Sequence, residues 1–211
     1  RFETPSPATS GRHETRAMPL VVIDDVLAPS VCRALIAEAD VNQWLTSTAE
    51  IRRSSHGLCV FKRVDGDVPS QLVGARDARP RFAVIDAPLL ALRMFYRLVG
   101  SLPLTLEGAE LAGLKPIFRC TEYRCGEGTR QHIDPARETR AGQRSQLSII
   151  VFLNDGYGGG EIEFPEAERV VKARAGRACV FPHGLAHVDR VVTSGRKFVL
   201  ETEVFYDAEW M

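Results

Sequence analysis

Hydrophobic and polar positions follow different patterns in successive parts of this chain. Residues 1–17 are polar, with Pro, Ser, Thr and Gly and almost no apolar periodicity. Such a segment is expected to form a flexible arm or a leader that is not native, with Met18 as a candidate natural start. Residues 20–24, LVVID, form the first apolar run and predict a short strand.

Two helices are predicted before residue 113. The first follows Pro29 and has Ser30 as its expected N-cap, because serine accepts a hydrogen bond from a free N–H of the first turn. Its apolar residues fall on one helical face, and they are Cys32, Leu35, Ile36 and Ala39. The second is expected to open after Asp86-Ala87-Pro88 and to stop at Gly100. Apolar residues at helical spacing support it: Leu89, Leu92, Tyr96 and Val99. The region between the helices, residues 45–80, is rich in Ser, Gly, Asp and Arg and predicts loops with one strand at most.

From residue 113 the pattern changes to short β-branched and aromatic runs. Gly, Pro, Asp or Asn separates most of them, and they are KPIFRCTEY, QLSIIVFLN, GEIEF, ERVVKA, RACVF and RKFVLETEVFY. Short strands at this spacing favour a sandwich or jelly roll over alternating strands and helices. We therefore predict an α+β, mainly β fold: one domain over 18–211, with an α/β support at 18–112 and a jelly-roll core at 113–207.

Composition narrows the class of protein without identifying it. The chain has 211 residues, 45% hydrophobic and 26% charged, which is ordinary for a globular domain. Its 27 basic and 27 acidic residues cancel, so no nucleic-acid or membrane partner is expected. The longest apolar runs, such as 147–153, are far shorter than the roughly 20 residues of a spanning helix, and no signal peptide is visible. The sequence does not indicate an oligomeric state.

The cysteines are odd in number and scattered, which argues against a disulfide framework and favours a reducing cytoplasm. They are Cys32, Cys59, Cys120, Cys125 and Cys179. No second Cys or His cluster completes a zinc site around the pair at 120 and 125, so free thiols are expected.

Three residues predict a metal centre. His132 and Asp134 are two positions apart, so on a strand both side chains point the same way. His187 precedes a later strand, which a jelly roll can bring close. Two imidazoles and one carboxylate on one face form the triad typical of non-haem Fe(II) oxygenases, which leaves the other coordination positions open. His183, four residues earlier, is the competing third ligand.

Longer motifs surround this triad in a specific order. They are FRCTEYRCGEGTRQHID, LSIIVFLNDGYGGGEIEFP and GRACVFPHGLAHVDRVVTSGRKFVL. Residues 114–206 thereby resemble the prolyl-4-hydroxylase-like branch of the Fe(II)/2-oxoglutarate-dependent dioxygenases. The matching patterns are Y-x-x-G…H-x-D, a Gly-rich turn LN…GGE-x-x-F, and H-x(7)-G-x-[KR]. The resemblance implies a double-stranded β-helix core, and its spacing to Gly195 and Lys197 selects His187 over His183.

The resemblance also implies the cofactors and their ligands. Fe(II) is expected on His132, Asp134 and His187, with 2-oxoglutarate and O2 as co-substrates and ascorbate as reductant. Lys197 matches the basic residue that binds the remote carboxylate of 2-oxoglutarate, with its neighbour Arg196 as the alternative, and Tyr123 matches a tyrosine that donates to that carboxylate. The implied reaction is hydroxylation of an unactivated C–H, with release of succinate and CO2. Related halogenases lack the carboxylate ligand, so Asp134 favours hydroxylation.

The substrate is not determined by these motifs. The expected rim of the pocket comprises the loop at 135–144, the 45–80 region and the N-terminal arm. Arginines able to meet a carboxylate, a phosphate or an acidic peptide are Arg119 (which follows Phe118), Arg130, Arg137 and Arg144. An amino acid, a peptide including a prolyl peptide, and a small natural product all remain open. The alternatives are a non-enzymatic cupin-like or lectin-like jelly-roll module that binds a metal or ligand, and a zinc hydrolase.

Overall fold

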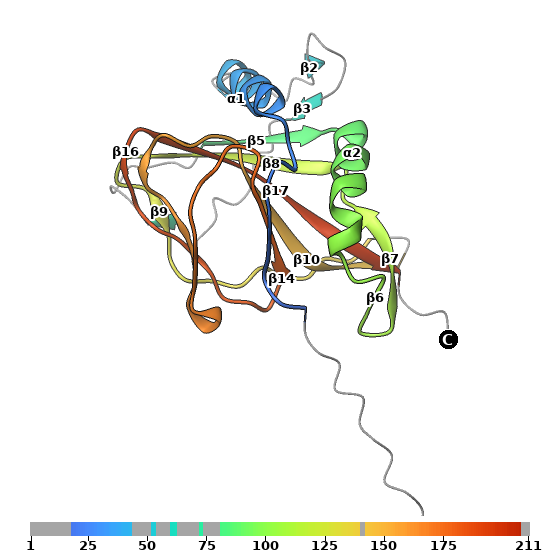
Figure 1. Ribbon diagram of the computed structural model, residues 1–211. Coiled ribbons are helices and arrows are strands. Elements are labelled where there is room, and N and C mark those ends of the chain that lie inside the picture. Colours follow the sequence, from blue (N-terminus) through green and yellow to red (C-terminus); the bar gives the residue numbers. More distant parts are fainter. Residues whose placement is uncertain are drawn as a thin grey trace, which may run out of the picture.

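The computed structural model describes residues 18–43, 52–53, 60–62, 72–73, 81–139 and 142–207. These ranges form a curled antiparallel sheet with two α-helices on its outer side (Figure 1). The expected arm at 1–17 and most of the 45–80 region lie outside the described residues. The described parts of 45–80 form three short strands, so the prediction of one strand at most is wrong. Within the described part of the chain, no helix is both long and apolar enough to cross a membrane.

The largest sheet has ten strands in the order β1-β14-β10-β17-β8-β5-β3-β2, with β7 beside β17 and β6 beside β7. Their bounds are β1 Val21–Ile23, β2 Arg52–Arg53, β3 Val60–Lys62, β5 Arg81–Asp86, β6 Thr105–Leu106, β7 Ala109–Leu114, β8 Ile117–Arg124, β10 Gln143–Phe152, β14 Ala178–Pro182 and β17 Arg196–Asp207. The long strand β17 pairs with β10 along one edge and with β8 and then β7 along the other. It is therefore the strand around which the barrel is organised.

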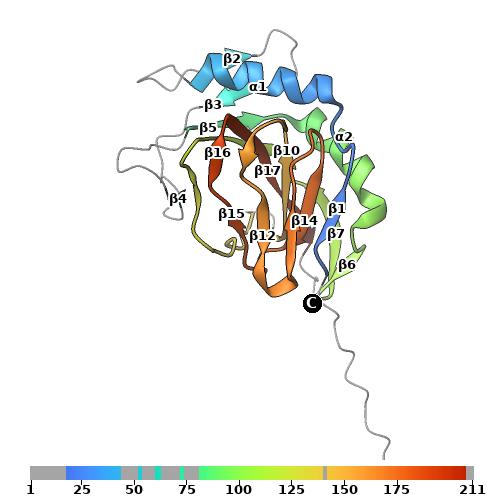
Figure 2. The ribbon, with the colours of Figure 1, turned by 60° about the vertical axis from the view of Figure 1, so that its left-hand side comes forward.

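Shorter strands close the barrel opposite this sheet. They are β4 Leu72–Val73 with β9 Gly128–Thr129, β11 Gly158–Gly159 with β16 Val192–Ser194, and β12 Ile162–Phe164 between β13 Arg169–Val171 and β15 Val188–Asp189. Figure 2 shows β12, β15 and β16 in front of β10 and β17. This arrangement confirms the predicted mainly β jelly roll with supporting helices.

Successive residues of β17 contribute to two different hydrophobic cores, one on each face of the sheet. Phe198, Leu200 and Val204 belong to the core that lies between the sheet and the helices. Val199 belongs to a second core inside the barrel, together with aromatic residues such as Phe152. Because successive strand residues point to opposite faces, Lys197 shares the interior face with Val199, as do the later odd-numbered residues of the strand. The interior face carries the functional groups.

The helix α1 (Pro29–Gln43) supports the outer face, but it starts earlier than predicted. The N–H groups of Val31 and Cys32 donate to Ala28 O at 2.9 and 3.1 Å. Ser30 therefore lies within the first turn and is not the N-cap, which corrects the sequence-based expectation. Proline at the first position needs no N–H partner, so the helix can begin there. The predicted apolar face is buried: Cys32, Leu35 and Ala39 lie in the core.

The second helix, α2 (Pro88–Leu98), begins as predicted but buries a different face. Its buried residues are Leu90, Ala91, Met94 and Leu98, whereas Leu89, Leu92 and Tyr96 are exposed. The segment PLLALRMFYRL is apolar around much of its circumference, so periodicity indicates a helix without indicating which side meets the sheet. Gly100 falls in the following 3-10 turn, η1 (Val99–Ser101). A second such turn, η2 (Pro165–Ala167), follows β12.

Gly176 ties the N-terminal segment to the barrel and provides a test of the fold. Its carbonyl accepts from Val26 N at 2.9 Å, and its φ is +84°. A Cβ there would lie 2.1 Å from Leu27 O. We expect Gly176→Ala to cost at least about 2 kcal/mol, from left-handed strain plus the clash. That corresponds to a melting temperature lower by roughly 4–8 °C in calorimetry.

The matched control for this prediction is Gly156→Ala. Gly156 has nearly the same φ, +82°, but nothing within 4 Å of an added Cβ. It should lose about 1 kcal/mol, the strain contribution alone. Equal losses in the two variants would contradict a role for the contact with Leu27.

Candidate metal centre

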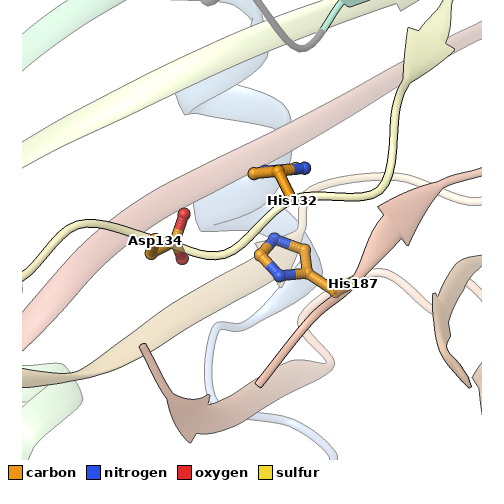
Figure 3. Close-up of side chains that lie close together, drawn as sticks. All are labelled: His132, Asp134 and His187. Carbon is orange, nitrogen blue, oxygen red and sulfur yellow. The ribbon is translucent and has the colours of Figure 1, made fainter. Parts of the chain in front are cut away.

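Backbone pairing brings the predicted triad together. His132 and His187 form an isolated antiparallel bridge, with N–H···O distances of 3.0 and 2.9 Å in the two directions. Asp134 N donates to His183 O at 3.0 Å, which extends the pairing by one step. The His-x-Asp segment is extended, as predicted, but it forms a bridge and not a regular strand. Figure 3 shows the three side chains close together from two chain segments.

Each residue of the triad places one potential metal-ligand atom in the same small region. One atom from each of His132, Asp134 and His187 lies within 4.8 Å of the other two. His132 Nδ1 is 2.9 Å from Arg130 O, and His187 Nδ1 is 3.3 Å from Leu185 O. A carbonyl only accepts, so each Nδ1 carries the proton and each Nε2 keeps a free lone pair. The donor set therefore fits Fe(II), which binds two imidazoles and a carboxylate on one face.

Aromatic packing holds His187 in an apolar wall. Its ring lies 4.7 Å from that of Phe181 and 5.8 Å from that of Phe164, between ring centroids. Burial lowers the pKa of His187, although the Asp134 carboxylate opposes this change. The neutral imidazole is the form that binds a metal, so the surroundings favour it.

A chain of hydrogen bonds orients Asp134 behind the metal site. Ser148 Oγ donates to Asp134 Oδ2 and lies 2.7 Å from His183 Nδ1, and His183 Nε2 lies 3.0 Å from Ser145 Oγ. Because the single Ser148 proton goes to Asp134, His183 must donate through Nδ1 and accept through Nε2. Burial lowers the pKa of His183, in agreement with this neutral tautomer. Both of its ring nitrogens are used, so His183 supports the triad and His187 completes it.

Loss of the Ser148 hydroxyl tests this support. We expect Ser148→Ala to weaken metal affinity by about 10- to 100-fold, the usual effect of removing a partner of a metal ligand. The measurement is a competition titration with a chelator, with melting temperature as the folding control. Unchanged affinity would show that Asp134 needs no orientation by Ser148.

A buried cation lies further inside the barrel. Lys197 has no exposed side-chain surface, pairs across the strands with Tyr123, and forms an ion pair with Asp189. Its Nζ lies 5.1 Å from the Tyr123 ring centroid, and Tyr123 Oη is 3.5 Å from Asp189 Oδ2. Burial raises the pKa of Tyr123, so its hydroxyl stays protonated and can donate. Lys197, Tyr123 and Asp189 form a polar cluster within the barrel.

Arg196 lies on the other side of β17. Its guanidinium is half exposed, 3.4 Å from Glu122 Oε1 and stacked on Phe198 at 5.2 Å. Strand alternation gives the reason, since neighbouring residues point to opposite faces. The structure thus brings Lys197, and not Arg196, into the interior with Tyr123.

The predicted substrate arginines are dispersed. Arg119 and Arg137 line a cavity of about 480 Å³ that reaches Asp134 and Ser148. Arg130 and Arg144 are exposed and do not line it.

Several polar residues of the site were not identified from the sequence, and they are Ser148, Asp189, Glu201 and Glu203. The sequence pattern that could have indicated the two glutamates is the spacing of charged residues in an otherwise apolar strand. Lys197, Glu201 and Glu203 are an even number of positions apart, so all three fall on the interior face of β17.

Comparison with known proteins supports the same interpretation. Residues 118–202 match the family model of the 2OG-Fe(II) oxygenase superfamily. No curated protein sequence matches the chain significantly.

Solved structures of prolyl hydroxylases share the fold. A viral collagen prolyl hydroxylase from Paramecium bursaria Chlorella virus-1, in complex with 2OG, has 15% identity and a TM-score of 0.56, with 88% of this chain and 95% of that chain covered. A Pseudomonas putida prolyl-4-hydroxylase has 18% identity and a TM-score of 0.54, with 92% and 95% covered. A Trichoplax adhaerens prolyl hydroxylase, in complex with a hypoxia-inducible-factor peptide fragment, has 17% identity and a TM-score of 0.53, with 88% and 83% covered.

Residues 118–202 thus match the 2OG-Fe(II) oxygenase superfamily, and the chain has a prolyl-4-hydroxylase-like fold around its His-Asp-His cluster.

Proposed function

We propose that this protein is an Fe(II)- and 2-oxoglutarate-dependent dioxygenase that hydroxylates an unactivated C–H of an amino-acid, peptidyl or small natural-product substrate. His132, Asp134 and His187 hold the iron. The observation that carries the proposal is the convergence of two free imidazole nitrogens and a carboxylate oxygen inside the same barrel that encloses Lys197. A passive jelly-roll module has no need of that buried cation beside a metal triad.

Fe(II), when bound with 2-oxoglutarate, supplies O2 activation: one oxygen atom enters succinate, CO2 leaves, and the other oxygen becomes the hydroxyl of the product. The protein binds the co-substrate and excludes water. Lys197 and Tyr123 meet its remote carboxylate, since a dianion in an apolar barrel needs a cation and a donor at that end. Phe164 and Phe181 keep the histidine side of the centre dry.

The range of substrates follows from the neighbours and from the site. The similar structures are prolyl hydroxylases, one of them with a bound peptide, so a peptidyl substrate, including a prolyl one, belongs to the proposed range. Intact Asp134 supports hydroxylation over halogenation. We further propose ascorbate as the reductant, a single catalytic domain over residues 18–211, and a cytoplasmic location, the last because the four cysteines in the described ranges are free.

The direct test uses the purified full chain. Anaerobic Fe(II) and 2-oxoglutarate should together produce a visible charge-transfer band that neither gives alone. Admission of O2 with ascorbate should then yield succinate slowly, even without the prime substrate. Zn(II) in place of Fe(II) is the matched control and should give neither signal. A protein that binds no iron, forms no band and releases no succinate contradicts the proposal.

A further inference from the structure

The cavity beside Asp134 has a distinctive set of charges. It is enclosed by the interior faces of β5, β8, β10 and β17 and by the segment after Asp134. Three cations and two carboxylates line it in addition to Asp134: Lys115, Arg119, Arg137, Glu201 and Glu203. Its volume, about 480 Å³, lies within the range of small-molecule sites. A molecule bound here would contact the metal ligand Asp134 and its partner Ser148.

Glu203 is already satisfied by its neighbours. Its Oε2 accepts from Lys115 Nζ at 3.3 Å, and its Oε1 is 3.0 Å from Arg137 Nε. Two cations on one carboxylate leave little reason for it to bind a further cation. It therefore contributes to the wall and is not the group that a ligand would contact first.

Arg119 and Glu201, in contrast, form an incomplete pair. They lie opposite each other on β8 and β17, and Arg119 Nε is 3.6 Å from Glu201 Oε2, too far for a good hydrogen bond. Arg119 Nε is buried and has no hydrogen-bond partner among the described residues. The guanidinium is fixed by stacking on Phe82, 4.7 Å from the ring centroid. Arg119 thus holds a partly exposed guanidinium at a fixed position in the cavity wall, and its buried Nε lacks a partner among the described residues.

Glu201 supplies the opposite charge. Its Oε2 accepts from Thr121 Oγ1 at 2.8 Å, which leaves Oε1 without a direct donor in the described part of the chain. Burial raises the pKa of the Glu201 carboxyl, and the Arg119 guanidinium opposes this change. A cationic ligand group beside Oε1 would stabilise the carboxylate further. The remaining wall combines polar side chains, such as those of Ser148 and Thr202, with apolar ones, such as those of Val84 and Ile150.

We propose that this cavity is the prime-substrate site and that its substrate is a small zwitterion, an amine that also carries a carboxylate, such as a free amino acid. Arg119 binds the carboxylate and Glu201 binds the ammonium group, while apolar residues of the wall, such as Val84 and Ile150, contact the side chain of the substrate. This inference rests on the proposed function. A segment inside a peptide chain has no free ammonium group and no free carboxylate. It would remove water from Arg119 and Glu201 without neutralising either charge. A dicarboxylate would meet Glu201 with the wrong sign.

The experiment uses the full chain loaded anaerobically with Fe(II) and 2-oxoglutarate. Proteinogenic amino acids and short ω-amino acids are added singly, and a change in the visible band reports binding next to the metal. At least one is expected to shift the band and, with O2 present, to raise succinate formation about tenfold or more. Its Nα-acetyl and carboxamide derivatives, which each lack one charge, should bind at least about 30-fold more weakly.

Variants locate the binding groups. Arg119→Gln and Glu201→Gln should each lose at least about 30-fold in affinity for the responding amino acid. Arg124→Gln is the matched control, because Arg124 is on the same strand, outside the cavity, beside Glu122. It should respond like the unaltered protein.

The same measurements distinguish a wrong substrate class from a wrong reaction class. A band and uncoupled succinate without any amino-acid response would overturn the zwitterion site and leave the oxygenase intact. A response only to prolyl peptides or dicarboxylates, or equal affinity for the capped derivatives, would overturn it too. Absence of both band and succinate would contradict the oxygenase itself.

Discussion

His132→Ala protein is expected to lose the visible band with Fe(II) and 2-oxoglutarate and to release succinate at least about 100-fold more slowly. Loss of an outer partner of a ligand alone costs about 10- to 100-fold in affinity, and removal of a ligand should cost more. The remaining Asp134 and His187 would hold the metal by two protein atoms. Metal content after dialysis and succinate release measure the effect.

The control is His183→Gln, because His183 was the competing ligand. Its ring nitrogens contact Ser148 and Ser145, so it orients Asp134 without donating to the metal. This variant should keep the band, with metal affinity lower by at most about tenfold. Loss of the band in His183→Gln with retention in His187→Gln would show that the triad has been assigned wrongly.

A double variant at the buried ion pair is expected to lose 2-oxoglutarate affinity while it keeps its fold. Lys197→Met alone would leave Asp189 as an uncompensated buried charge and cost about 3–5 kcal/mol in stability. Lys197→Met with Asp189→Asn removes both charges and preserves volume, so the melting temperature should change little. A buried charge contact contributes about 2–4 kcal/mol to binding, so the 2-oxoglutarate concentration at half-maximal band intensity should rise about 30- to 1,000-fold.

Asp189→Asn alone gives the complementary result. Lys197 would no longer have a carboxylate partner in the chain, so the co-substrate would meet the full charge of the ammonium group. We expect tighter 2-oxoglutarate binding than in the unaltered protein, by about tenfold. If the double variant binds 2-oxoglutarate as well as the unaltered protein, Lys197 does not contact the co-substrate.

The sequence alone predicted the class of fold and the three residues that we propose as metal ligands. Period-two runs after residue 113 predict strands because alternation reports burial of one face, and each of the six predicted runs contains a strand. Strands outside these runs, such as β5 and β7, were not expected, since they gain their stability from pairing with β8 and β17. A metal site at His132, Asp134 and His187 could be predicted because residue type and motif spacing are properties of the sequence itself.

Tertiary structure decided which side of each element is used. The face of α2 was predicted wrongly because its exposed face carries apolar residues beside Arg93 and Arg97. Packing against the sheet selects Leu90 and Met94 over Leu89 and Tyr96. Lys197 and Arg196 are equally basic in sequence, and the register of β17 with β8 sends one inward and the other to the surface. The Arg119–Glu201 pair and the Asp189 counter-ion depend on cross-strand neighbours far apart in the chain. Such contacts are set by how the strands pair, which local patterns do not encode.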